Sequence, residues 1–189
     1  SSEARTRAVA ARIISRSHPL PGNAMALLKK LARDPHPRPR LETVVACSNI
    51  PTIESFKTAL TVLDSKTDRF LHYSLSQTVH TLKSLWLPAM ESGELAFSKP
   101  EYLAFTLEAF GGGAAAELAR KTLQSDIDSS TRNRLLAVLA KVGTAADAQS
   151  ILNQEHQDAS LLNALIDDWP KRRLKPAAPF APRLLELLD

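Results

Sequence analysis

The sequence predicts an all-α protein in which pairs of short amphipathic helices stack into an α-α superhelix of about four to five pairs. Helical segments recur two at a time, split by a tight turn that contains Asp and is followed by basic residues. The clearest copy covers residues 27–45, where the turn also contains Pro, and a second covers residues 118–139. Apolar residues recur in both at helical spacing, and no segment has the pattern of a convincing strand. Because neither helix of such a pair can bury its apolar stripe alone, this self-similarity is the signature of a solenoid.

The first predicted helix covers residues 3–15. Val9, Ile13 and Ile14 share one stripe at helical spacing and are predicted to be buried. The Pro- and Gly-rich run at residues 18–22 ends the pattern. A chain that begins inside a helix resembles the second half of a pair, so we interpret it as a segment excised from a longer protein.

Three further helices are predicted before residue 64. Asn23 is placed to cap the first of them, and the turn at residues 34–39 separates it from the second. Pro51 and Thr52 open the third. The apolar positions predicted for these helices are Leu27, Leu28, Leu31, Leu41, Val44, Val45, Ile53, Phe56, Leu60 and Leu63.

The longest predicted helix runs from residue 69 to residue 87 and ends near Pro88. A surface loop is expected over residues 89–98. The buried stripe of the long helix is predicted at Leu71, Leu75, Val79, Leu82 and Trp86.

The second half of the chain is predicted to begin with a helix up to Phe110, which the glycines at residues 111–113 stop. Gly143 is expected to end a helix that starts after residue 130, and Thr144 to cap the next one. The stripes here are Leu103, Leu107, Phe110, Ala115, Leu118, Ala119, Leu123, Leu135, Val138, Leu139 and Val142.

The remaining residues are predicted to contain a helix over 161–169 capped by Asp158, a basic Pro-rich stretch at 171–183 that resembles a linker, and a last element at 184–188. The whole chain, residues 1–189, is predicted to be a single domain of helical repeats.

Composition excludes several classes of site. Cys47 is the only cysteine, which rules out an internal disulfide, a thiol-based zinc cluster and a covalently attached haem. Its apolar neighbours predict a buried, inert thiol. No apolar run approaches the about 20 residues needed to span a bilayer, so we predict no membrane insertion. The net charge of +4 is a weak indication of an acidic partner.

No motif for catalysis or for a cofactor stands out. Residues 111–116 fit a relaxed dinucleotide fingerprint, but a helix rather than a strand is predicted before them. His72 and His80 lie about 12 Å apart along a helix, too far for one metal ion. Asp34 with Arg38 or Arg40 is interpreted as an ion pair or cap within one repeat. We therefore predict no enzyme activity, no cofactor, no metal and no small-molecule substrate.

The turn and helix at residues 34–44 resemble the HEAT-repeat pattern, in which an Asp-Pro turn precedes an arginine at the start of the second helix. Residues 132–137 echo it, with Thr131 where an aliphatic residue is usual. The resemblance covers most of residues 3–170 and is firm at these two copies. It implies a HEAT-like solenoid.

A narrower resemblance is carried by residues 34–45, 59–60, 68–75, 77–82 and Trp86. These are similar to the HEAT region of large membrane-bound dehydrogenases of planctomycete-type bacteria. In those proteins a sugar-dehydrogenase-like β-propeller precedes the repeats and a cytochrome c domain follows. The resemblance implies a non-catalytic scaffold module that positions catalytic and electron-transfer domains of a larger exported redox protein. An extracytoplasmic, periplasmic location is implied by this resemblance alone.

The polar residues predicted to form an interaction surface belong to the second helices of the pairs, or to the long helix. If the repeats stack in register, Arg40 and Arg134 occupy equivalent positions in a basic ladder. The full set is Arg38, Arg40, Tyr73, Gln77, Lys83, Arg132 and Arg134. A protein partner, from neighbouring domains or another chain, is the first hypothesis. The alternative is a nucleic-acid-binding domain similar to the HEAT-like alkylpurine DNA glycosylases, whose affinity would fall steeply with salt.

Overall fold

The computed structural model describes residues 3–153 together with residues 161, 163 and 165. These residues form helices and no strand, which confirms the predicted all-α class. The chain divides into two compact units whose boundary in sequence lies between Tyr102 and Leu103, and each is described here by itself. The predictions for Asp158 as a cap and for the stretches beyond residue 165 lie outside the described residues. The single repeat domain over residues 1–189 stays a prediction.

The described helices are α1 (Ala4–Arg16), α2 (Ala24–Leu31), α3 (Pro37–Ser48), α4 (Ile53–Leu60), the 3-10 helix η1 (Thr61–Asp64), α5 (Arg69–Thr81), α6 (Lys83–Glu91), α7 (Pro100–Phe110), α8 (Gly112–Leu123), α9 (Ser129–Val142) and α10 (Ala145–Leu152).

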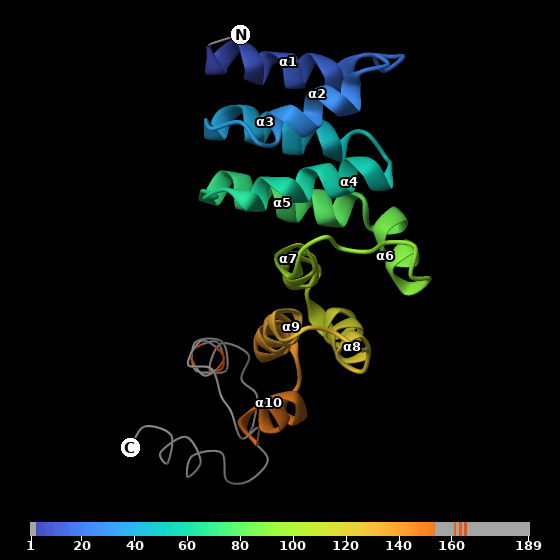
Figure 1. The fold of residues 1–189 in the computed structure, drawn as a ribbon, viewed down its shortest axis with the longest axis vertical. Helices are drawn as coiled ribbons and strands as arrows, with labels where there is room; N and C mark the ends of the chain where they lie inside the picture. The colour runs from blue at the N-terminus through green and yellow to red at the C-terminus, as the bar shows by residue number, and fades with distance from the viewer. Residues whose placement is uncertain (1–2, 154–160, 162, 164, 166–189) are drawn as a thin grey trace. The chain divides into compact units, whose positions relative to one another are not determined.

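The first unit is built of two layers of helices. Helices α1, α3 and α5 pack side by side in one layer, and Figure 1 shows them stacked in chain order. Helices α2 and α4 contact each other and pack against α3, while α4 also contacts α5. This is the stacking of helix pairs that the sequence predicts. The largest fully buried side chains of the first unit are Leu28, Phe56, Leu60, Leu71, Leu75, Leu82 and Trp86.

Polar side chains start several of these helices. Thr52 accepts a hydrogen bond from the backbone N–H of Ser55, and Asp68 accepts from two amides of the first turn of α5. His36, which the sequence analysis did not single out, does the same at α3 through Nδ1. Asn23 lies at the N-cap position of α2, as predicted, but its side chain makes no capping hydrogen bond.

The predicted buried stripe of α1 is wrong at two of its three positions. Ile14 is buried, whereas Val9 is 42% exposed and Ile13 is 61% exposed. The buried face instead consists of Ala8, Ala11 and Ile14. Small alanines allow α1 to approach α3 closely, and α1 is the first helix of its layer within the unit. Its other large apolar side chains therefore have no neighbouring helix in this unit to cover them.

The predicted longest helix is two helices. The helical path breaks at Leu82, where φ is −96° and ψ is 12°, and α6 then continues through Pro88 to Glu91. The predicted end near Pro88 and the start of the loop at residue 89 are therefore wrong. All five stripe residues are nevertheless buried. Trp86 explains how the break is accommodated, because its indole N–H donates a 2.7 Å hydrogen bond to the carbonyl of Val79.

Asp34 pairs with an arginine of α1, not with an arginine of its own repeat. Its carboxylate accepts two hydrogen bonds from Arg7 of α1, at 2.5 and 2.8 Å, and one from the backbone of His36. Arg38 pairs instead with Glu42 at 3.1 Å. Arg40 is buried, and its guanidinium donates to the carbonyls of Asp34 and Lys66. The predicted pair of Asp34 with Arg38 or Arg40 is corrected accordingly.

The Arg7–Asp34 pair makes the stability of the first unit depend on pH. The hydrogen bond from Arg7 holds the pKa of Asp34 below its ordinary value and outweighs burial, which acts in the opposite direction. A depressed folded pKa means that the contribution is complete above about pH 4 and is lost as the pH falls through the folded value. We expect Asp34→Asn to lower stability at neutral pH and to flatten its decline in acid. Urea unfolding at a series of pH values measures this, and an Asp34→Asn curve parallel to that of the parent would contradict it.

The second unit contains the rest of α7 and helices α8, α9 and α10, with α9 in contact with α8 and α10. Gly111 and Gly112 adopt φ values of +69° and +68°, which explains why glycines separate α7 from α8. The predicted cap at Thr144 is confirmed as a capping box with Asp147. Gly143 ends α9 as predicted.

Candidate functional site

The structure spreads the predicted interaction residues over both units. Tyr73 and Gln77 are exposed on α5, and Lys83 is exposed at the start of α6. Arg132 and Arg134 are exposed on α9 of the second unit. The structure therefore brings Tyr73 and Gln77 onto one helix, and the two arginines of α9 onto another.

Arg40 does not belong to an exposed surface. It is 6% exposed and its guanidinium is occupied by backbone carbonyls, whereas Arg134 is exposed, so the two are not equivalent positions. Arg38 is exposed but already paired with Glu42. The predicted basic ladder is therefore wrong for Arg40, which is a buried structural residue.

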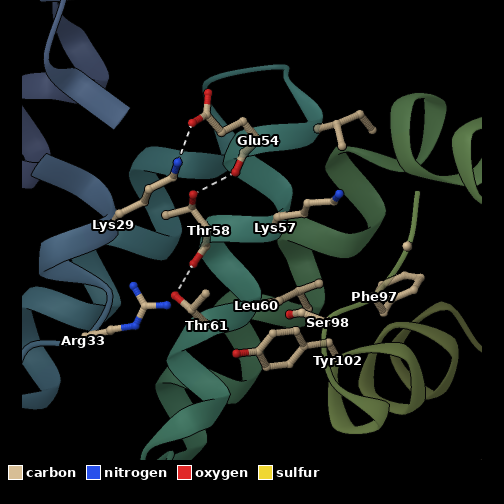
Figure 2. A pocket seen from close by; sticks show the side chains of 12 residues that line it. Lys29, Arg33, Glu54, Lys57, Thr58, Leu60, Thr61, Phe97, Ser98 and Tyr102 are labelled. Carbon is tan, nitrogen blue, oxygen red and sulfur yellow. Dashed lines mark hydrogen bonds and ion pairs between the residues drawn. The ribbon is translucent and has the colours of Figure 1, made fainter. Parts of the chain in front are cut away.

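A groove of about 410 Å³ lies on the first unit, in the layer formed by α2 and α4. Its walls are α2, α4 with η1, and the segment at residues 96–102. Figure 2 shows Lys29 and Arg33 on one side of the groove and Phe97 and Tyr102 on the other. A volume of this size is typical of ligand-binding sites in proteins.

Positive charge dominates the polar part of the groove. Lys29 is paired with Glu54 at 2.6 Å, which leaves this pair neutral. Arg33 and Lys57 also line the groove, and neither charged group makes a hydrogen bond or ion pair with the described residues. Both side chains belong to exposed residues. The groove therefore presents two cations that form no ion pair with the described residues, although the charge of Arg33 also acts on nearby Asp64.

Much of the remaining lining is apolar or already hydrogen-bonded. Ile53, Leu60 and Phe97 supply aliphatic and aromatic surface. The hydroxyls of Thr58 and Thr61 donate to carbonyls of the preceding helical turn, at 2.7 Å in both cases. A ligand with an apolar part next to a negative charge matches this combination.

Tyr102 and Lys99 hold the 96–102 segment in place. Both contact Asp64 at the end of η1: the Tyr102 hydroxyl donates at 2.5 Å and Lys99 Nζ at 2.7 Å. Burial alone would raise the pKa of Asp64, but these two hydrogen bonds and the charges of Lys99 and Arg33 lower it. Asp64 is thus ionised at neutral pH and fixes one wall of the groove.

Cys47 is fully buried in α3, and burial raises the pKa of its thiol to about 12, as the prediction of an inert thiol requires. Within the described part of the chain, no three His, Cys, Asp or Glu side chains lie close enough to hold a metal ion. The glycines at 111–113 follow helix α7, not a strand, so the setting of a dinucleotide fingerprint is absent there. None of the described helices combines the length and apolar character needed to cross a bilayer.

The sequence pattern does not reveal this groove. Its residues come from α2, α4 and a segment that was predicted as a surface loop up to residue 98. One signal was available, because Lys29 and Arg33 are four residues apart and point to the same side of the chain. Nothing in the sequence pattern pairs them with Lys57 or Phe97.

Comparison with known proteins finds no family model, curated protein or solved structure that matches this chain significantly. The resemblance to HEAT repeats therefore stays a prediction.

Proposed function

We propose that this chain is a non-catalytic protein-interaction module and that the groove beside α2 and α4 is where a segment of a partner protein docks. One observation carries the proposal: the charged groups of Arg33 and Lys57 make no hydrogen bond or ion pair with the described residues and lie next to an apolar lining. Stacked helices support such a role, because they hold the walls of a groove on elements packed into one core. On the narrower resemblance, the partner belongs to the catalytic or electron-transfer domains of a larger exported redox protein.

A protein segment fits the groove better than a nucleic acid. Glu54 stands in the wall, and a continuous phosphate backbone would pass close to its carboxylate. The apolar surface of Ile53, Leu60 and Phe97 offers nothing to phosphate or sugar. A peptide can place acidic and apolar side chains alternately, so it satisfies both parts of the lining.

The test is the binding of a fluorescent peptide of alternating Glu and Leu to the full chain, followed by anisotropy at low salt. We expect Arg33→Gln with Lys57→Gln to weaken binding about ten-fold, because two exposed charge contacts are lost at up to about 1 kcal/mol each. The matched control is Arg16→Gln with Lys66→Gln, two exposed cations of the first unit that do not line the groove. This pair removes the same charge and should leave the affinity within about two-fold.

Two outcomes would overturn the proposal. One is equal weakening by both double variants, which would mean non-specific attraction to the net charge. The other is that duplex DNA binds and the peptide does not, with an affinity that falls steeply between about 50 and 200 mM salt. That second result would support the nucleic-acid alternative.

A further inference from the structure

A second hollow of about 690 Å³ lies beside the first and shares Lys29 and Arg33 with it. It is lined in addition by Arg7 of α1, by Lys30 and by the turn that begins at Asp34. Because Lys29 and Arg33 line both hollows, the two hollows are adjacent near the C-terminal end of α2. We call the two adjacent hollows together the α2 track.

The charges along the α2 track are unevenly compensated. Arg7 is neutralised by Asp34 and Lys29 by Glu54. Lys30 is exposed and, like Arg33 and Lys57, makes no hydrogen bond or ion pair with the described residues through its charged group. Lys29 and Lys30 lie in the last turn of α2, where cations also complement the helix dipole. Arg33 therefore lies where the two hollows meet. Lys57 adds a positive charge to the first hollow, and Lys30 adds one to the second.

We propose that the α2 track binds an extended acidic peptide segment of a partner protein, with one acidic position at Arg33 and Lys57, an apolar side chain beside Phe97, and a second acidic position at Lys30. The inference rests on the proposed function. It adds the chemistry of the partner segment and the path of that segment over the two hollows. A compact anion would be held by one hollow alone. An extended segment uses both, because the shared Arg33 stands between them.

Phe97 is the specificity-determining residue of the track. It lies in the segment that Tyr102 and Lys99 hold against Asp64, so its position is set by well-bonded neighbours. Figure 2 shows its ring on the side of the groove away from Arg33. A partner side chain that reaches the ring removes apolar surface from water, and a segment with acidic residues alone does not gain this contribution.

The experiment compares two acidic peptides with a Leu at the same position. The short one has about four residues and spans at most about 13 Å, and the long one has about nine and spans about 30 Å. Both are titrated into the full chain and into Lys30→Gln, Phe97→Ala and Lys66→Gln, the last being an exposed lysine outside the track. Circular dichroism confirms that each variant is folded.

We expect Lys30→Gln to weaken the long peptide about two- to five-fold and to leave the short one unchanged. Phe97→Ala should weaken both, and the loss should vanish when the Leu of the peptide is replaced by Ser. Lys66→Gln should affect neither. If Lys30→Gln has no effect on the long peptide while Arg33→Gln with Lys57→Gln abolishes binding, the extended track is wrong and the docking groove stands. If duplex DNA competes for the track better than the long peptide does, the peptide assignment is overturned.

Discussion

Replacing Trp86 with alanine is expected to lower the free energy of unfolding of the first unit by about 3–5 kcal/mol. Trp86 is fully buried, and its ring stacks on Phe56 with centroids 5.9 Å apart and an interplanar angle of 12°. The substitution leaves a large cavity between α4 and α6 and removes the indole N–H that satisfies the carbonyl of Val79. A loss of this size is a large share of the stability of a typical domain.

Two further variants separate these contributions. Trp86→Phe keeps a ring against Phe56 but removes the hydrogen bond to Val79, and it should cost about 1–3 kcal/mol. Phe56→Leu combined with Trp86→Ala gives a double-mutant cycle for the ring contact, because each substitution removes one of the two rings. Urea unfolding of the full chain, followed by far-UV circular dichroism, measures all of them. A loss below about 1 kcal/mol for Trp86→Ala would show that the α4–α6 contact is not part of the core.

Replacing Arg40 with alanine should be the second most damaging change, at about 2–4 kcal/mol. The buried guanidinium donates to the carbonyl of Asp34 at 3.0 Å and to that of Lys66 at 2.8 Å. These carbonyls belong to two different turns, one before α3 and one before α5. Arg40 therefore ties one helix pair to the next, and without it both carbonyls lose a charged donor.

Arg40→Lys tests whether the fork of the guanidinium is needed. One ammonium group cannot reproduce two donors on separate nitrogens aimed at separate carbonyls, so lysine should restore only part of the loss. The readout is the same urea titration. If Arg40→Ala and Arg38→Ala have equal effects, the assignment of Arg40 to the core is wrong, because Arg38 is exposed and pairs only with Glu42. If Arg40→Ala and Arg38→Ala weaken peptide binding equally and neither changes the free energy of unfolding, Arg40 belongs to the interaction surface.

The sequence pattern predicted helix ends and buried stripes correctly where the chemistry of the local residues determines the structure. Thr52, Thr144 and Gly143 lie at helix ends because side-chain oxygens and glycine satisfy terminal backbone groups there. The stripe of Leu71 and Leu75 followed from the 3.6-residue period.

The wrong predictions concern positions where contacts with another part of the chain determine the helix path or the burial. Helical spacing continues from Leu75 through Leu82 to Trp86, so the pattern does not reveal a break that a hydrogen bond from Trp86 to Val79 accommodates. Pro88 was expected to end the helix, but it is the sixth residue of α6 and the helix continues past it despite the missing N–H. Likewise, Val9 and Ile13 have the spacing of a buried stripe, but burial also needs a neighbour on that side.

The candidate groove was beyond prediction for a related reason. Arg33 and Lys57 are ordinary surface cations in the sequence, and they become a site only when α2 and α4 pack together. Phe97 joins them because Asp64 holds the segment that carries it. Arg40, in contrast, was expected on the surface since charged residues are seldom buried, and only the two carbonyls explain its position.

Because Cys47 is fully buried, the native protein is well suited to site-specific labelling at an added cysteine. With no exposed surface and a thiolate disfavoured at neutral pH, this sulfur will not compete for a maleimide dye. A single added cysteine, such as Ser98→Cys at the rim of the groove, would then carry the only label, and occupancy of the groove could be followed by its fluorescence without altering α3.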